Sequence, residues 1–227
     1  MRGLFITFEG LDGCGKTTQI KLLKDYLEGQ GRKVVLTREP GGTKISEDIR
    51  DIILDVANKE MSYTCEMLLY AAARAQLVQQ VIKPSLEEGA VVLCDRFVDS
   101  SYVYQGFARG LGIEKVHKIN QIAMDEVAPD ITLFFDITPE VSLQRRMKVS
   151  TGDRIEKEQL EFHQKVYEGY KYLASKYPDR IKIIDANCEI EEVRIKVLEK
   201  IEKIVSTVNL YGKVNTSSKS MAVPDSK

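Results

Sequence analysis

The sequence predicts an α/β fold with a central five-stranded parallel sheet flanked by helices. Two observations support this fold class: short apolar runs recur along the chain, and patterns typical of helices lie between them. Each run is apolar almost throughout rather than alternating, as in strands buried on both faces of a parallel sheet. The expected strands are residues 4–8, 33–37, 90–94, 131–137 and 181–184. Strand, helix and strand in that order favour right-handed crossovers in one doubly wound sheet.

The first helix follows the first strand directly. Ile20, Leu23 and Leu27 are spaced by three and four residues, so they share one face of a helix. Gly29 and Gly31 come next and are typical of a helix end. A chain made of helices alone is disfavoured, because Gly and Pro interrupt the helical pattern too often.

The overall composition excludes several classes of protein. The chain has 227 residues, and its 33 Lys and Arg against 34 Asp and Glu give a formal charge of −1. No charge imbalance therefore favours binding to nucleic acid or to a membrane surface. Hydrophobic residues make up 43% and charged residues 30%, a mixture typical of a folded globular domain rather than of a disordered chain.

Cysteine spacing and hydropathy indicate a cytoplasmic protein. The four cysteines, at positions 14, 65, 94 and 188, are far apart, and the chain has only two histidines. We therefore expect neither a disulfide framework nor a zinc site. No apolar run approaches the roughly 18 residues of a membrane-spanning helix, and residues 4–8 are too short for the core of a signal peptide.

A glycine-rich turn joins the first strand to the first helix. Residues 10–17 match the motif G-x-x-x-x-G-K-[ST] in full, between a strand and a helix as the motif requires. Backbone N–H groups of such a loop, with the helix N-terminus, cradle a nucleoside triphosphate. Lys16 would supply a charge for the β- and γ-phosphates, and Thr17 a hydroxyl for Mg²⁺. The candidate nucleotide-binding residues are Gly10, Leu11, Asp12, Gly13, Cys14, Gly15, Lys16, Thr17 and Thr18.

The rest of the chain disfavours two kinds of P-loop protein. Asn58-Lys59-Glu60 is followed by Met61, so the guanine-reading motif N-K-x-D of GTPases is absent. A mechanical ATPase would usually show a strand ending in paired acids, whereas here the third strand ends in Asp95 and is followed by Arg96. An acid followed by a base indicates a loop that faces both a metal ion and a second anion.

Three arginines predict that second anion site. Arg38 and Arg96 follow the second and third strands, and loops at the carboxyl ends of neighbouring parallel strands converge on one crevice. Arg50 lies on the next helix. Guanidinium groups suit bidentate binding of phosphate, so a phosphorylated acceptor facing the triphosphate is the natural interpretation. Each arginine alone is more often a solvated surface charge.

A pocket for a base is indicated between these arginines. Tyr70 and Arg74 are one turn apart on an expected helix, so an aromatic ring and a hydrogen-bonding fork share one face. The alternative for Tyr70 is packing in the core. Residues 99–106 are rich in hydroxyl groups and include the amide of Gln105, which suits recognition of a small polar ligand.

At these segments the sequence resembles the bacterial thymidylate kinases. The resemblance is carried by residues 8–19, 37–42, 73–74 and 95–106, and by residues 153–156, which we expect to open a late helix. It spans residues 3 to about 206. It implies the P-loop nucleoside monophosphate kinase fold and transfer of the γ-phosphoryl group of ATP, with Mg²⁺, to dTMP. The product is dTDP, for the synthesis of dTTP.

The resemblance also implies roles for individual residues. Arg74 and Gln105 would contact the thymine edge, Tyr70 would stack on the base, and Tyr104 would crowd the 2′ position of the sugar. Arg96, with Arg38 and Arg50, would hold the 5′-phosphate. The implied dTMP site is Arg38, Glu39, Arg50, Tyr70, Arg74, Arg96, Ser101, Tyr104 and Gln105. Thr17 and Asp95 are the implied metal contacts, and Asp12, Lys16, Arg96 and Arg154 the catalytic residues.

A lid is expected at residues 145–154. Some family members carry an arginine in the P-loop where this chain has Gly13, so the charge for the transferring group should come from the lid. Arg154 is the first candidate, with Arg146 and Lys148 as alternatives, and Gly152 provides a hinge.

The resemblance further implies a homodimer formed through helices on one side of the sheet. Met67, Leu68, Leu77, Val78 and Val81 could form that surface, although such apolar stripes are more often core. We expect residues 1–210 to form the kinase domain and the polar residues 211–227 to form a flexible tail.

Other functions remain open at this point. A kinase for another nucleoside monophosphate differs in the acceptor it phosphorylates, and a nucleoside kinase would not need Arg38 and Arg96. An ATP-dependent switch would bind ATP but phosphorylate no nucleotide.

Overall fold

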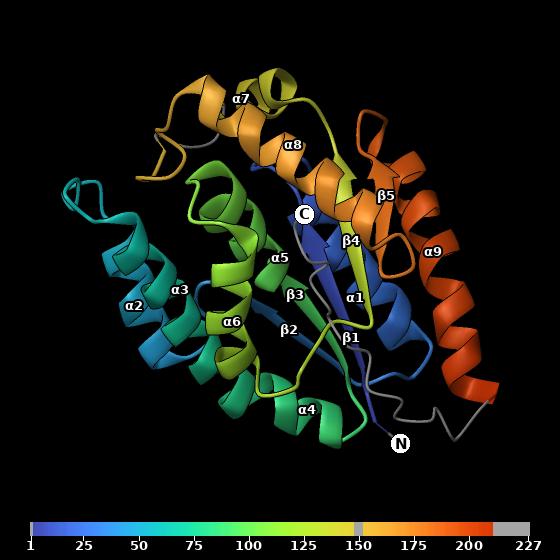
Figure 1. Ribbon diagram of the computed structural model, residues 1–227. Helices are drawn as coiled ribbons and strands as arrows, with labels where there is room; N and C mark the ends of the chain where they lie inside the picture. Colours follow the sequence, from blue (N-terminus) through green and yellow to red (C-terminus); the bar gives the residue numbers. More distant parts are fainter. Residues whose placement is uncertain (1, 148–151, 211–227) are drawn as a thin grey trace.

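A single parallel sheet forms the centre of the protein. The computed structural model describes residues 2–147 and 152–210 (Figure 1). Five strands, all parallel, lie in the order β2-β3-β1-β4-β5. They are β1 (Leu4–Glu9), β2 (Val34–Arg38), β3 (Val91–Asp95), β4 (Ile131–Asp136) and β5 (Ile181–Asp185). The predicted fold class is confirmed, and each strand lies within one residue of its predicted bounds.

Helices cover both faces of the sheet (Figure 1). On one face lie α1 (Lys16–Gly29) and α9 (Ile190–Leu210), which pack against each other. The other face carries α3 (Tyr63–Leu77), η1 (Val78–Ile82), α4 (Lys83–Glu87), α5 (Val98–Ser101), η2 (Tyr102–Ala108), α6 (Ile113–Met124) and α8 (Leu160–Lys176). Helix α2 (Lys44–Leu54) packs on α3, and α7 (Pro139–Met147) lies against the loop that follows β1.

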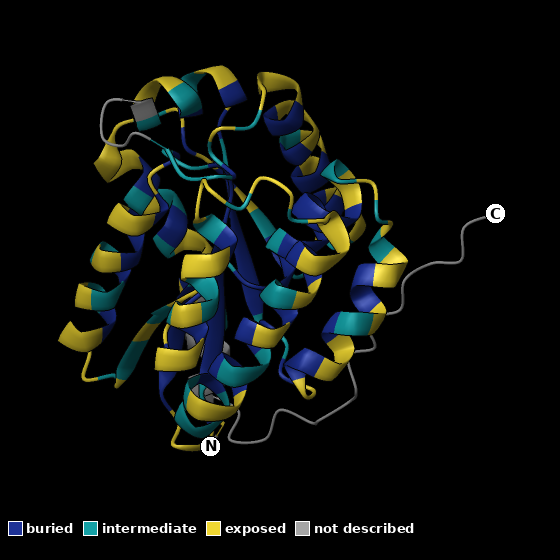
Figure 2. Ribbon diagram, turned by 90° about the vertical axis from the view of Figure 1, so that its left-hand side faces the viewer, coloured by how far each residue is buried: buried dark blue, intermediate teal, exposed yellow. Residues whose placement is uncertain are grey.

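Successive side chains of each strand point to opposite faces of the sheet, so the hydrophobic core forms two clusters. Phe5 points into the larger cluster, which includes residues of α3, η2 and α8, whereas Leu4, Ile6 and Phe8 point to α1 and α9. Figure 2 shows the central strands as buried, with exposed residues on the outer faces of the helices. Ile20, Leu23 and Leu27 belong to the second cluster, as their spacing predicts.

The expectation that every strand is buried on both faces is wrong for the two outer strands. Three residues of β2 are half-buried and two are exposed, and β5 is also partly exposed, because each has a neighbour on one side only. β1 is buried along its whole length. The sheet thus protects the strand that carries the glycine-rich loop.

The segment at residues 153–156 does not open a helix, contrary to our expectation. The carboxylate of Asp153 accepts hydrogen bonds from the backbone N–H groups of Ile155 and Glu156, at 2.9 Å each, and this closes a turn. Helix α8 begins only at Leu160. Among the described residues, no helix is long and apolar enough to cross a membrane.

Candidate active site

A cavity of about 560 Å³ opens at the carboxyl ends of β1, β2 and β3. Its volume is in the range of small-molecule sites. The predicted site residues that line it are Asp12, Gly13, Gly15, Lys16, Thr17, Thr18, Arg38, Glu39, Arg50, Tyr70, Arg74, Asp95, Arg96, Ser101, Tyr104 and Gln105. Gly10, Leu11, Cys14 and Arg154 are not among the lining residues. One crevice therefore brings together nearly all the residues assigned to either nucleotide.

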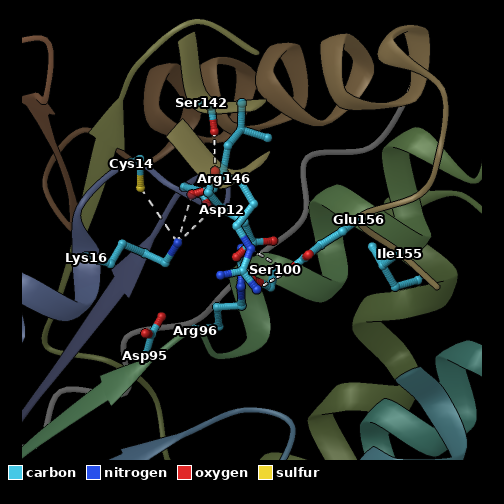
Figure 3. A network of polar contacts seen from close by, with 12 residues as sticks. Asp12, Cys14, Lys16, Asp95, Arg96, Ser100, Ser142, Arg146, Ile155 and Glu156 are labelled. Carbon is cyan, nitrogen blue, oxygen red and sulfur yellow. Dashed lines mark hydrogen bonds and ion pairs between the residues drawn. The ribbon is translucent and has the colours of Figure 1, made fainter. Parts of the chain in front are cut away.

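Lys16 begins α1 and folds back over the glycine-rich loop (Figure 3). Its Nζ donates to the carbonyl oxygens of Gly10, at 3.1 Å, and Leu11, at 2.9 Å, and lies 3.6 Å from Cys14 Sγ. The lysine is only 5% exposed, yet it lines the cavity. The two carbonyl oxygens therefore hold the ammonium group of Lys16 in place. A phosphate that enters the loop can accept hydrogen bonds from it instead.

Thr17 and Asp95 meet at the mouth of the same loop. The hydroxyl of Thr17, in the first turn of α1, donates to Oδ2 of Asp95, the last residue of β3, at 3.2 Å. A hydroxyl and a carboxylate side by side, next to a phosphate cradle, suit Mg²⁺, which keeps several waters and takes few protein ligands. Among the described residues, no group of three or more His, Cys, Asp or Glu is arranged to hold a metal ion.

Gly13 allows α7 to approach the loop. Its φ is +88°, and a Cβ at this position would lie 2.6 Å from the backbone oxygen of Ser142. The Ser142 hydroxyl donates to the carbonyl of Asp12, so the loop and α7 are joined directly. This packing brings Arg145 and Arg146, at the end of α7, to the wall of the cavity.

Arg96 has a left-handed backbone, with φ of +66°, which is unusual for a residue other than glycine. Such conformations cluster at functional sites. One terminal nitrogen, Nη2, donates to Asp12 Oδ1 at 2.8 Å, and the other, Nη1, donates to Ser100 Oγ at 3.3 Å and Tyr170 Oη at 3.2 Å. Burial favours a higher pKa for Asp12, but Arg96 and Lys16 hold this pKa well below its usual range.

The other two phosphate candidates lie further out on the cavity wall. Arg38 is half exposed and pairs with Glu47 at 2.7 Å. Arg50 donates through Nη1 to the backbone oxygen of Pro40 at 2.9 Å. Arg38 is held only by an exposed ion pair, which contributes little to stability, so it can be redirected toward an incoming anion.

Arg74 is 1% exposed and is held by three partners. Its Nε donates to Glu39 Oε2 at 2.9 Å, and Nη1 donates to Ser101 Oγ at 3.1 Å and to Asn120 Oδ1. Burial raises the pKa of Glu39 to about 7, although Arg74 opposes this shift. Glu39 lines the cavity, but its clear contact is with Arg74, which indicates that it orients this arginine.

The remaining base-pocket residues come from α3 and η2. Tyr70 is half-buried, one turn before Arg74. Tyr104 packs edge-on against Tyr170, with ring centroids 6.4 Å apart, and Gln105 donates through Nε2 to Glu66 Oε1 at 3.0 Å. Because a carboxylate only accepts, this bond fixes the amide nitrogen of Gln105 toward Glu66 and uses one of its two N–H groups, so the carbonyl oxygen is available as an acceptor for a ligand. Helix η2 has π-type hydrogen bonding, which often occurs at functional sites.

Arg154 points away from this cavity. Its Nε donates to the backbone oxygen of Ile53 at 2.8 Å, and Nη2 pairs with the buried Glu66 at 2.6 Å. It lines a second, open cavity beside α3. Arg146 does line the main cavity and bonds Glu156 through Nε at 2.8 Å. Lys148 lies outside the described residues.

Sequence reasoning missed several residues that organise the site: Glu9, Glu66, Ser100, Asn120, Glu156 and Tyr170. Their roles depend on partners far away in the chain; Tyr170 and Glu9, for example, are 161 positions apart. One signal was present, because Glu9 is an acid that ends an otherwise apolar strand and buried acids need partners.

Comparison with known proteins agrees with this geometry. The family model described as thymidylate kinase matches residues 8–197. The chain belongs to the thymidylate kinase family. Thymidylate kinases from Thermoanaerobacter sp. (strain X514) and Caldanaerobacter subterraneus subsp. tengcongensis are 54% and 51% identical to it over 203 residues. These alignments cover 89% of this chain and 99% and 97% of the relatives.

A solved structure supports the family assignment. The crystal structure of thymidylate kinase from Ehrlichia chaffeensis superposes with a TM-score of 0.73 at 34% identity, covering 89% of this chain and 99% of that one. The activity is therefore that of the thymidylate kinase family, phosphorylation of dTMP to dTDP in nucleotide biosynthesis, with ATP as the donor. The expected fold and function are both confirmed.

Proposed function

We propose that the cavity holds ATP and dTMP with their phosphates facing each other. The observation that carries the proposal is that Lys16, from the donor loop, and Arg96, from the acceptor side, line one cavity, where Arg96 pairs with Asp12 and both cations lower the pKa of that carboxylate. Two cations fixed in one wall offset the repulsion between donor and acceptor phosphates. Asp12 balances the charge of these two side chains until the nucleotides enter.

The donor side is the glycine-rich loop. Its backbone N–H groups and Lys16 bind the phosphates of ATP, while Gly10, Leu11 and Cys14 shape the loop from behind. Thr17 and Asp95 fit Mg²⁺, which when bound neutralises charge on the β- and γ-phosphates. The protein's part in this step is to hold that hydroxyl and carboxylate together at the loop.

On the acceptor side, different residues bind the base, the sugar and the phosphate of dTMP. Arg74 and Gln105 contact the thymine edge, with Ser101 fixing Arg74, and Tyr70 stacks on the ring. Tyr104, packed against Arg96 and Tyr170, crowds the 2′ position and favours deoxyribose. Arg96, with Arg38 and Arg50 beside it, binds the 5′-phosphate.

We further propose that this is the family type with its transfer arginine near the lid. The site of Gly13 leaves no room for a side chain, and Arg146 both lines the cavity and helps to lower the pKa of Asp12. Arg154 would first have to leave Glu66 and Ile53. We therefore favour Arg146 over Arg154 as the group that contacts the transferring phosphoryl.

A homodimer is the assembly we propose. Exposed apolar side chains occur on α3 and on the two helices that pack against it: Leu68 on α3, Ile45 and Ile52 on α2, and Ile122 on α6. Of the five residues suggested by the sequence, Met67, Leu77 and Val78 are core instead, and Leu68 is exposed. Sedimentation equilibrium measures the assembly directly.

The domain bounds and the location also remain proposals. The family match to residues 8–197 supports one kinase domain over residues 1–210, and the proposed tail at residues 211–227 lies outside the described residues. All four cysteines are free thiols, which fits a reducing cytoplasm.

A panel of acceptors with Mg·ATP as the fixed donor tests the proposed site. We expect dTMP to be phosphorylated with kcat/KM at least about a hundredfold above dCMP and dAMP, because Gln105 and Arg74 present one acceptor and one donor to the base, and above UMP, because Tyr104 crowds its 2′-hydroxyl. Thymidine, which lacks the phosphate that Arg96 binds, should not be a substrate. Equal rates with thymidine and dTMP would contradict the acceptor site.

A further inference from the structure

A cluster of hydrogen bonds holds Arg96 from one side, and of its members Ser100 lines the cavity, whereas Glu9 and Tyr170 do not. Glu9, at the end of β1, is fully buried. Its Oε1 accepts from the backbone N–H groups of Phe97, at 2.8 Å, and Ser100, at 3.3 Å. Its Oε2 accepts from the hydroxyls of Ser100, at 2.6 Å, and Tyr170, at 2.7 Å. Four donors on one carboxylate are typical of a group that must stay in place.

Chemistry fixes the direction of the hydrogen bonds to Arg96, whereas between Ser100 Oγ and Tyr170 Oη, 3.0 Å apart, either hydroxyl can donate. A guanidinium group can only donate, so Ser100 Oγ and Tyr170 Oη are acceptors toward Arg96 Nη1. Each hydroxyl has a single proton, and in its bond to Glu9 the carboxylate receives it. The carboxylate therefore turns the lone pairs of both hydroxyls toward the arginine.

The ring of Tyr170 cannot move easily. It stacks on Phe134 of β4 with centroids 5.1 Å apart and a 16° angle, and it meets Tyr104 edge-on. Tyr170 is 2% exposed and comes from α8, far along the chain from the strands that end at the cavity. Its hydroxyl is thus a fixed acceptor that the sheet itself holds in place.

Arg96 consequently has a fixed side and an exchangeable side. Nη1 is bound by the hydroxyls of half-buried Ser100 and buried Tyr170, whereas Nη2 is bound by Asp12, whose side chain is 39% exposed and lines the cavity. An anion in the cavity can replace or join Asp12 on Nη2 without disturbing Nη1. The left-handed backbone of Arg96 is what aims the side chain between the two sides.

We infer that Tyr170, with Ser100 and through their common acceptor Glu9, is a positioning residue that presets Arg96 for the phosphate of the acceptor nucleotide. This inference rests on the proposed role of Arg96 and extends it, because the arginine's affinity for phosphate then depends on a residue that never touches the ligand. Preorganisation of this kind lowers the cost of ordering a long side chain on binding.

Calorimetric titration with dTMP and with thymidine tests the inference, since the two ligands differ only in the phosphate. The variant Tyr170→Phe keeps the ring and its packing but removes the hydroxyl. We expect dTMP to bind about tenfold more weakly, the loss of one hydrogen bond to a charged group, and thymidine to bind within about twofold of wild type. In steady-state assays KM for dTMP should rise while KM for ATP stays unchanged.

Three further variants make the result decisive. Tyr102→Phe is a matched control, because it also removes a buried tyrosine hydroxyl, one that bonds His117 rather than Arg96. It should leave both affinities unchanged. Ser100→Ala should act like Tyr170→Phe, since it removes the second acceptor of Nη1. Arg96→Met should abolish the preference for dTMP over thymidine.

The outcomes separate this inference from the proposed function. Equal weakening of dTMP and thymidine in Tyr170→Phe would mean a merely structural role and would overturn the inference, as would no change in either affinity. If Arg96→Met keeps the preference for dTMP, the proposed phosphate role of Arg96 fails, and the inference with it. If Arg96→Met loses that preference and Tyr170→Phe retains it, only the inference fails.

Discussion

The guanidinium of Arg74 lies almost wholly inside the protein and still lines the cavity. Its charge is matched by Glu39, which is 5% exposed and has one carboxylate oxygen, Oε1, without a hydrogen-bond partner. Burying an ion pair is costly, and removing one partner leaves the other charge uncompensated. At the scale of single residues, base recognition is therefore linked to stability.

We predict that Arg74→Met loses thymine selectivity and also about 3–5 kcal/mol of unfolding free energy. Glu39 already has a raised pKa of about 7, and without Arg74 it must take up a proton to stay buried. A raised folded-state pKa gives stability below the unfolded pKa that is lost as pH rises. The deficit, measured by urea unfolding, should therefore be larger at pH 8 than at pH 5.

The double variant Arg74→Met, Glu39→Gln is the control for this prediction. It removes both charges, so it should recover part of the lost stability and remove most of the pH dependence. Thymine selectivity should stay impaired. The same deficit at both pH values in Arg74→Met would show that Glu39 is not the buried charge responsible.

The functional residues that could be predicted from the sequence are those that lie next to one another in a single motif. The loop at residues 10–17 is recognisable because one short segment supplies backbone, lysine and hydroxyl together. Glu39 was assigned to dTMP but contacts Arg74, a distinction that needs the packing of α3 against the end of β2. Glu9 and Tyr170 could not be paired, because no local pattern joins a strand end to a distant helix.

At the scale of secondary structure, the strands were predictable and the ends of helices were not. Buried parallel strands are apolar throughout, which the sequence displays directly. Whether a strand lies at the edge depends on the order in the sheet, and β2 and β5 take that place only once the fold is known. The turn at residues 153–156 replaced an expected helix start because Asp153 bonds its own neighbours.

That turn separates two arginines that the sequence places in one basic segment. We predict that Arg146→Met lowers kcat about a hundredfold with little change in KM for dTMP, because a cation on the transferring group acts mainly in the transition state. Arg154→Met should lower stability more than kcat, since Arg154 pairs with buried Glu66. Steady-state kinetics and thermal unfolding of both variants check this.

Arg2→Met is a suitable control, since Arg2 lies outside the cavity and its ion pair with Asp130, 3.6 Å long, is at the surface, where such pairs contribute little to stability. It should change neither measurement. A larger loss of kcat in Arg154→Met than in Arg146→Met would place Arg154, not Arg146, on the transferring group.

At the scale of the whole molecule, a formal charge of −1 conceals a separation of charge. Seven basic side chains line the cavity, at positions 16, 38, 50, 74, 96, 145 and 146, against five acidic ones, at positions 12, 39, 95, 153 and 156. The parallel sheet produces this result, because its carboxyl ends gather loops from β1, β2 and β3 at one edge. A nearly neutral protein can thus present a site with more basic than acidic side chains.

The central claim is that one cavity holds both nucleotides with their phosphates in line. Calorimetric binding of a single molecule that joins adenosine to thymidine through five phosphates tests it most directly. If both sites face each other across Asp12, this ligand should bind at least about a hundredfold more tightly than dTMP alone, because its second half binds intramolecularly. Binding no tighter than that of dTMP would contradict the claim.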